Sequence, residues 1–290
     1  MTIRHQIEGR AGIGLRLPHI AEMVATRPPA EWLEIHPENF LANPHAAELL
    51  TELARHYPIS VHMVGISIGS ASGIDRHHLE RLRKLIERIN PALVSGHLAW
   101  STHGSDYLND LLPLPFTDES LKLVTDHLQQ VQDVLGRSYL VENPSSYVRF
   151  KNSTMTEAEF LAEIAARTGC GLLCDVSNVY LSAHNMGYDP YEYLEQIPPK
   201  FVRELHLGGY TPEEDESSPG VELLVDTHAA PVSDPAWGLY TYALGRFGAK
   251  PTLIEWDNDI PALPMLLEQA ARAEAIIGAV QASETNYVAG

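Results

Sequence analysis

Short apolar runs alternate with helix-compatible segments along the whole chain, and this alternation limits the fold more than any other feature. Strands that alternate with helices form parallel sheets. Eight such units in 290 residues favour a single (β/α)8 TIM barrel, with a doubly wound open sheet as the alternative. The predicted strands are residues 12–17, 32–36, 59–64, 93–98, 138–142, 171–176, 202–207 and 252–256.

Several segments between the strands have helical periodicity. Thr156 and Glu159 have the spacing of a capping box that opens a helix through Ala166, and residues 261–280 form the predicted closing helix. We find no linker or repeat, so we expect one domain over residues 1–290 with a core at about 12–280. The connections 101–118 and 209–233 are unusually long and would lie over the mouth of the barrel. Two helices have apolar residues at helical spacing: Leu79, Leu82, Leu85, Ile86 and Ile89, then Leu121, Val124, Leu128, Val131 and Leu135.

Charge and composition exclude several classes of function. The chain has 20 Lys and Arg against 38 Asp and Glu, a net charge of −18, which disfavours nucleic acid as a partner. It has no apolar run long enough to cross a membrane, and the first residues lack the apolar core of a signal peptide, so we expect a cytoplasmic protein. The glycines near residue 12 do not form a GxGxxG loop, and no P-loop is present.

Metal-binding residue types stand at the ends of seven of the eight predicted strands. In a barrel these side chains would point into one mouth. Several ionisable groups in one low-dielectric pocket are costly unless cations compensate them, and these strand ends supply almost no lysine or arginine. Metal ions are therefore the economical explanation. The residues are His36, His62, His97, Glu142, Asp175, His206 and Glu255.

The number of candidate ligands indicates more than one metal ion. Asp226 and His228 form a D-x-H pair in the long connection after the seventh strand. Together with the three histidines His62, His97 and His206, two glutamates and Asp175, they give eight potential ligands. We expect two or three metals with Glu142 as the bridging carboxylate. Imidazole and carboxylate ligands without thiolates suit iron, manganese or zinc.

Other polar residues near the strand ends are secondary candidates. His36 with Glu38 could bind metal, orient a ligand or form a polar turn, and we favour the orienting role. His184 is expected near Asp175 and Asn178. Asn143 is a further candidate ligand or hydrogen-bonding residue beside Glu142. Seven histidines are expected at the surface: His5, His45, His56, His77, His78, His103 and His127.

The motifs resemble those of the multinuclear non-heme iron-dependent oxidative enzymes, or MNIO family, formerly domain of unknown function 692. The resemblance runs from about Gly12 to Ile277, and the motifs occur in the family's order. Trp237 and Tyr240 follow the string VDTHAAPV and belong to the same motif. The strings that carry the resemblance are GIGLRLPH, LEIHPENF, SVHMVGISIGS, SGHLAWS, LVENPSSY, CDVSNVYLSAHN, ELHLGGY, VDTHAAPV and LIEWDNDIP.

This resemblance implies a barrel holding two or three irons as a mixed-valent Fe(II)/Fe(III) centre, with no organic cofactor. The matching motifs imply that one iron would be held by His62, His97 and Glu142. A second would be held by Asp175, His206 and Glu255, with Glu142 as the bridge. A third would be held by Asp226 and His228, with Asn178. Glu142, Asp175 and Glu255 would be the catalytic carboxylates. Family members use O2 to modify cysteine, or other residues, of a ribosomally made precursor peptide, often with a partner protein that presents the peptide. Where many relatives have a histidine after the asparagine of SAxN, this chain has Met186.

Two other functions use the same residue types. A zinc or manganese barrel of the xylose-isomerase-like type, acting as a hydrolase or sugar isomerase, has similar ligands at the same strand ends. The net charge disfavours a DNA substrate, and no strand end supplies the lysine that such an isomerase usually needs. A non-catalytic metal-binding or peptide-binding module would instead saturate its metals with protein ligands and leave no open position.

Overall fold

The computed structural model describes residues 7–104, 106–214 and 220–288, and its centre is a closed barrel of parallel strands. Around the barrel the strands follow the order β1, β12, β9, β8, β7, β4, β3 and β2. This confirms the predicted barrel, and every predicted strand overlaps one barrel strand. Their bounds are β1 Ala11–Gly14, β2 Leu33–Ile35, β3 Ile59–Met63, β4 Leu93–His97, β7 Leu140–Glu142, β8 Gly171–Asp175, β9 Val202–Gly208 and β12 Thr252–Glu255.

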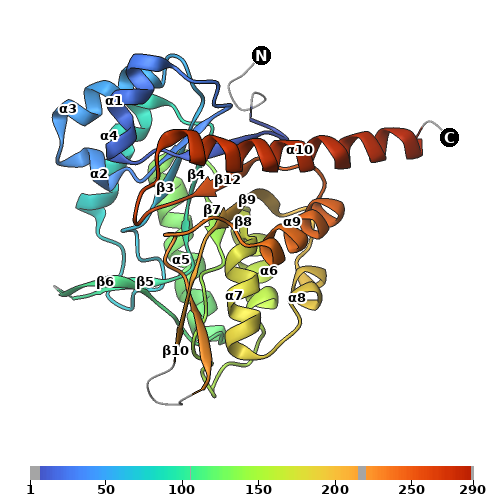
Figure 1. Cartoon of the computed structure of the whole chain (residues 1–290). Helices are drawn as coiled ribbons and strands as arrows, with labels where there is room; N and C mark the ends of the chain where they lie inside the picture. The colour runs from blue at the N-terminus through green and yellow to red at the C-terminus, as the bar shows by residue number, and fades with distance from the viewer. Residues whose placement is uncertain (1–6, 105, 215–219, 289–290) are drawn as a thin grey trace.

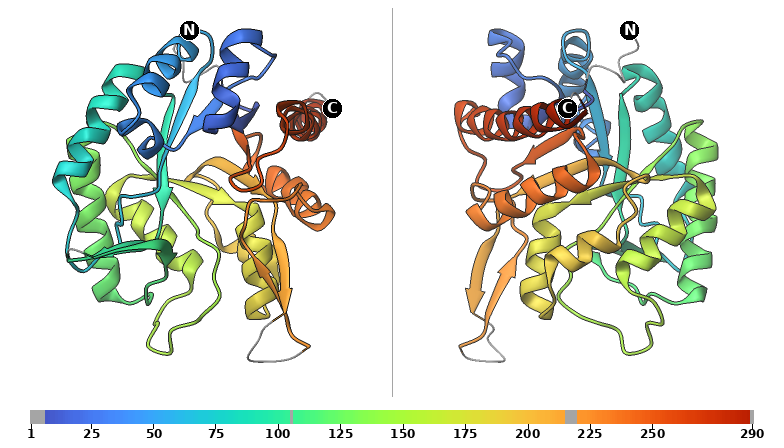
Figure 2. Two further views of the ribbon diagram at one scale, coloured as in Figure 1. Left: turned by 60° about the vertical axis from the view of Figure 1, so that its left-hand side comes forward. Right: turned by 90° about the vertical axis from the view of Figure 1, so that its right-hand side faces the viewer.

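Helices surround the strands and cover the outer face of the barrel (Figures 1 and 2). The capping box of α6 forms as predicted: the Thr156 side chain accepts from the Glu159 backbone N–H, and the Glu159 side chain accepts from the Thr156 N–H. The helices are α1 Leu17–Thr26, α2 Glu38–Leu41, α3 Pro44–Leu53, α4 Arg76–Ile89, α5 Asp118–Leu135, α6 Glu157–Thr168, α7 Val176–Met186, α8 Pro190–Gln196, α9 Asp234–Phe247 and α10 Leu263–Val288.

The predicted apolar faces of α4 and α5 are buried against the barrel. His127 was expected at the surface but is buried on the same face of α5, because it lies three residues from Val124 and four from Val131. Its Nδ1 lies 2.8 Å from the carbonyl oxygen of Ile68. No helix in the described ranges is both long enough and apolar enough to cross a membrane.

The two long connections contain antiparallel hairpins that project away from the barrel (Figures 1 and 2). The first joins β5 Trp100–His103 to β6 Asp106–Leu112, and the second joins β10 Thr211–Glu214 to β11 Glu222–Val225. The second hairpin packs on α7: the Asn185 side chain donates to the Leu224 carbonyl and accepts from the Leu224 N–H, each at 2.9 Å. Both connections follow strands that carry candidate metal ligands.

Glu157, at the start of α6, fastens the connection 143–156 to α8. The Tyr193 hydroxyl donates to Glu157 Oε1 at 2.6 Å, and the Ser146 hydroxyl donates to Oε2 at 3.3 Å. Burial is the main reason that the pKa of Glu157 is raised from 4.5 to about 7, and the two hydroxyls oppose the rise. Between about pH 4.5 and 7 the folded protein therefore retains a proton here that the unfolded chain releases.

This raised pKa predicts that Glu157→Gln stabilises the protein more at pH 8 than at pH 5. Because the folded pKa exceeds the unfolded one, the stability contributed by Glu157 is complete below pH 4.5 and is lost as pH rises through about 7. Glutamine does not titrate, so the variant escapes this loss. The side chain is only half-buried, so we expect about 1–2 kcal/mol, or roughly 3–6 °C in Tm, at pH 8. The measurement is Tm as a function of pH for wild type, Glu157→Gln and the control Glu119→Gln, which changes an exposed residue. If the Tm of Glu157→Gln depends on pH in the same way as that of wild type and the control, the prediction is wrong.

Candidate metal centre

Parallel strands deliver the predicted ligands to one end of the barrel. His97, Glu142, Asp175 and Glu255 are the last residues of β4, β7, β8 and β12. Register places His97 beside Glu142 and Asp175 beside His206, and laterally paired residues point their side chains to the same face. Because the carboxyl ends of all barrel strands share one rim, the side chains meet there.

His62, His97 and Glu142 form one compact group. Nε2 of His62 lies 3.1 Å from Nε2 of His97 and 3.2 Å from Oε2 of Glu142, and the His97 nitrogen lies 3.4 Å from the same oxygen. Nδ1 of His62 lies 2.8 Å from the Ser95 hydroxyl, which fixes the ring. Nε2 of His62, Nε2 of His97 and Oε2 of Glu142 are thus close enough together to bind one ion.

Glu142 also faces a second group. Its Oε1 lies 3.9 Å from Nδ1 of His206, and the same nitrogen lies 3.2 Å from Oε2 of Glu255. Asp175 joins Glu142 and His206 in one candidate set and His228 and Glu255 in another. The two carboxylate oxygens of Glu142 therefore point towards different groups of ligands, as a bridging role requires.

Asp226 and His228 come from the connection after β11. The His228 Nε2 lies 2.8 Å from Oδ1 of Asp226, while its Nδ1 lies 3.1 Å from Oδ2 of Asp257. His228 has φ 45°, a left-handed backbone conformation that is uncommon for histidine. Its N–H donates to the Gly209 carbonyl at 2.9 Å, and its own carbonyl accepts from Asp257 N–H at 2.8 Å. The surrounding structure thus holds this residue in a strained position beside the cluster.

The two asparagines have different roles. Asn143 binds the Asp175 backbone twice, accepting from its N–H at 2.9 Å and donating to its carbonyl at 3.0 Å. Both ends of its amide are used, so Asn143 positions Asp175 instead of offering a ligand atom. Asn178 is buried in the first turn of α7, donates to the Asn143 carbonyl at 3.2 Å and leaves its Oδ1 without a partner.

Other secondary candidates lie elsewhere. His184 does not lie beside Asp175, because it is nine positions further along the chain, roughly 13 Å along a helix. It is exposed and lies 3.2 Å from the Glu222 carbonyl oxygen. Glu38 accepts from the Gly65 N–H at 2.9 Å and lies 3.5 Å from Nε2 of His78, outside the candidate sets. Met186 lines a separate cavity.

His36 lies at the edge of the cluster and forms a further possible metal-binding set with Glu255 and Asp257. Its Nε2 is 3.2 Å from Oε1 of Glu255 and 3.1 Å from a guanidinium nitrogen of Arg16. Almost no cation was expected at the strand ends, and Arg16 is the exception: it follows β1, is 4% exposed and also pairs with Asp257. Arg16 offsets carboxylate charge on the Glu255 side of the mouth.

Two buried carboxyl groups beneath the cluster were missed from the sequence. Glu34 and Glu204 are fully buried inside the barrel, each two residues before a candidate histidine. Their oxygens lie 3.5 Å and 3.9 Å from Nε2 of His206. A spacing of two residues along a strand places side chains on the same face, so this signal was present in the strings LEIH and RELH.

The residues present fit resident metal ions. Buried polar atoms normally have hydrogen-bond partners, yet among the described residues Asp175 Oδ2 and Asn178 Oδ1 have none, while Glu142 Oε2, His206 Nε2, Asp226 Oδ1 and His228 Nε2 face only other ionisable side chains. Burial and neighbouring carboxylates raise the pKa of Glu142 well above its usual value, and burial raises that of Asp175 to about 6. Burial lowers the pKa of His97 to about 4, so this ring is neutral and can bind metal at pH 7. Cations would satisfy the unpartnered atoms and favour the ionised carboxylates.

A groove of about 170 Å³ leads to the cluster from solvent. His97, Glu142, Asn178, Asp226, His228 and Glu255 line it, together with Val64, Leu111, Pro144 and Ser145. The candidate ligands that line the groove thus face open space on one side, which leaves room for a substrate group.

A family model described as "RiPP precursor modification enzyme MbnB/TglH/ChrH" matches residues 10–278. The chain belongs to this enzyme family. RiPPs are ribosomally made peptides that enzymes modify after translation. The chain is also 46% identical over 269 residues to a UPF0276 protein of Vibrio vulnificus (strain YJ016), covering 92% of this chain and 91% of the relative. The family match spans all the candidate ligands.

Solved structures with the same architecture are far more distant in sequence. A xylose isomerase domain protein from Planctomyces limnophilus superposes with a TM-score of 0.59 at 13% identity, covering 97% of this chain and 99% of that one. An L-ribulose 3-epimerase superposes with a TM-score of 0.59 at 15% identity, covering 96% and 97%. At such identities the likeness establishes the xylose-isomerase-like barrel alone, because one fold supports many chemistries.

Proposed function

We propose that this member of the family is an iron-dependent oxidase that uses O2 to modify cysteine in a ribosomally made precursor peptide. The observation that carries the proposal is the double-sided position of Glu142, between the His62 and His97 pair and His206. A carboxylate shared by two ligand groups suits a multinuclear centre. Bound iron would supply one-electron redox chemistry and O2 activation, which no side chain provides.

The protein's own groups have distinct tasks. His62, His97 and Glu142 would hold one iron, and Asp175, His206 and Glu255 would hold a second with Glu142 shared. Asp226 and His228, beside Asn178, would hold a third. Arg16 offsets charge at Glu255, and Asn143 keeps Asp175 in place through its two backbone hydrogen bonds. The groove would admit the peptide's thiol, while apolar Val64, Leu111 and Pro144 limit access of water.

Metal analysis tests this proposal directly. Protein produced with ample iron and purified without oxygen is expected to contain two or more irons per chain, with the EPR and Mössbauer signals of a mixed-valent centre. Stoichiometric zinc or manganese, retained after iron-replete growth, would contradict the proposal and favour a hydrolase or isomerase. Incubation with a cysteine-containing precursor peptide and O2 should then change the peptide's mass, and a partner protein that presents the peptide should raise the rate.

A further inference from the structure

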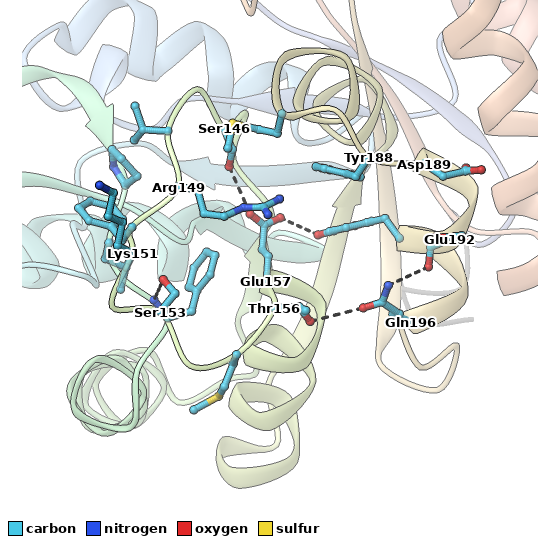
Figure 3. A pocket seen from close by; sticks show the side chains of 18 residues that line it. Ser146, Arg149, Lys151, Ser153, Thr156, Glu157, Tyr188, Asp189, Glu192 and Gln196 are labelled. Atoms are coloured by element: carbon cyan, nitrogen blue, oxygen red, sulfur yellow. Dashed lines mark hydrogen bonds between the residues drawn. The ribbon is translucent and has the colours of Figure 1, made fainter.

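A second cavity of about 480 Å³ lies beside the metal centre. The connection 143–156, the start of α6, the turn between α7 and α8, and α8 itself form its walls (Figure 3). Its lining includes none of the candidate metal ligands. The cavity therefore has no role in the chemistry described above, although its volume lies in the range of ligand pockets.

The cavity and the metal groove adjoin each other. Ser145 lines the groove and Ser146 lines the cavity, so consecutive residues of one connection separate the two spaces. Tyr147 continues this partition, and its hydroxyl accepts from the Asp226 N–H at 2.9 Å, next to His228. A chain that enters the groove needs only to cross this turn to reach the cavity.

Apolar side chains dominate the cavity wall. Val148 and Phe150 are 55% and 37% exposed on the connection, although exposed apolar residues in a cluster are uncommon without a binding role. The remaining apolar and aromatic lining comes from other elements: Leu114, Phe116, Met155, Met186, Tyr188 and Tyr193. Such a wall fits a large apolar side chain.

Positive charge stands at the rim. Arg149 and Lys151 lie on the same connection, and neither forms an ion pair among the described residues. On the opposite side, Asp189 is engaged as the N-cap of α8, where it accepts from the Tyr191 N–H at 2.8 Å. Glu157 and Glu192 also line that opposite side, so the two cations are confined to the connection, where they favour an acidic group on a ligand that lies against it.

We propose that this cavity binds an aromatic or long aliphatic side chain of the substrate polypeptide, next to an acidic residue that faces Arg149 and Lys151. The inference rests on the proposed function, since the occupant is the peptide whose modified residue reaches the groove. An extended peptide can fill both spaces because its successive side chains advance by about 3.3 Å per residue. The cavity would then select the substrate by a residue that the enzyme does not modify.

Labelled peptides test the proposal without turnover. Two series of fluorescein-labelled peptides each contain one cysteine. In the first series the pair Asp-Phe stands at varied distances before or after the cysteine, and in the second series Ser-Ser replaces that pair at the same positions. Fluorescence anisotropy with metal-free protein is expected to show that the best Asp-Phe peptide binds about tenfold more tightly than its Ser-Ser counterpart. Met186→Trp should fill the cavity and remove this preference, whereas Met265→Trp, at an exposed position of α10, should leave it intact.

A second pair of variants guards against misfolding. Val148→Asp places a charge on the wall at an exposed site and should also remove the preference, while Val134→Asp on α5 should not. A preference that is absent in wild type or unchanged in both cavity variants overturns the proposal. A second result would also overturn it. If the wild-type protein shows no preference between the peptides but self-associates in light scattering, and Met186→Trp abolishes that self-association, then a second copy of the chain occupies the cavity.

The same peptides separate this inference from the proposed function. Oxidation of the peptides by iron-loaded protein, together with no effect of Met186→Trp on binding, would overturn the subsite and leave the oxidase standing. A Met186-dependent preference without any oxidation would support the subsite for a polypeptide ligand and contradict the oxidase.

Discussion

Replacing Glu142 by glutamine is expected to lower kcat/KM for peptide modification at least a hundredfold, with the barrel still folded. Changes to groups that merely orient metal ligands cost about 10–100-fold, and a carboxylate shared by two ligand groups should cost more. Glutamine has nearly the same shape, but it cannot supply the carboxylate that metal binding needs at the oxygen lying 3.2 Å from His62 and 3.4 Å from His97. Its amide can bind only weakly as a bridge.

The effect on stability separates a lost metal site from a damaged fold. Burial raises the pKa of Glu142 well above its usual value, so its ionised form is unfavourable in the metal-free protein. The metal-free variant should therefore melt at or above the wild-type temperature, whereas its iron content and mixed-valent EPR signal should fall. Glu119→Gln, on the exposed first turn of α5, is the matched control. Wild-type iron content and turnover in Glu142→Gln would refute the bridging role.

The barrel could be predicted because its strands are short and almost completely buried. Strands β3 and β8 have no exposed residue, since helices cover one face and barrel side chains fill the other. Such strands appear in the sequence as nearly unbroken apolar runs. Polar residues at the ends of those runs, such as His97 and Asp175, therefore stand out in the sequence as candidate ligands.

Residues whose neighbours come from distant parts of the chain could not be placed in this way. Arg16 falls within the predicted strand 12–17, but it follows β1 and its side chain pairs with Asp257, which is far away in sequence. The hairpins in the long connections were missed because one strand of each, β6 and β10, is mostly exposed and lacks the apolar run of a buried strand. His184 was expected near Asp175, but α7 begins directly after Asp175 and carries His184 away along the helix. The periodicity of the sequence does not fix where that helix begins.

Gly209→Ala is expected to destabilise the metal-free protein by about 3 kcal/mol or more, roughly 5–10 °C in Tm. A Cβ at this position would lie 1.8 Å from the carbonyl oxygen of Ala230 and 2.4 Å from its carbonyl carbon. The obstacle is backbone, which cannot move aside as a flexible side chain could. Relief of the clash must push the segment 228–230 away from the end of β9.

That displacement would reach the metal centre, because the His228 N–H donates to the Gly209 carbonyl at 2.9 Å and its ring lies over Gly208. We therefore expect Gly209→Ala to bind less iron than wild type even at temperatures where it remains folded. Gly238→Ala supplies the opposite control, since Gly238 is exposed within α9 and its added Cβ would meet no atom within 4 Å. Alanine should stabilise that helix by about 0.5–1 kcal/mol. Equal melting temperatures and iron contents for Gly209→Ala and wild type would show that the segment 228–230 is not held against β9, and that His228 reaches the cluster by another path.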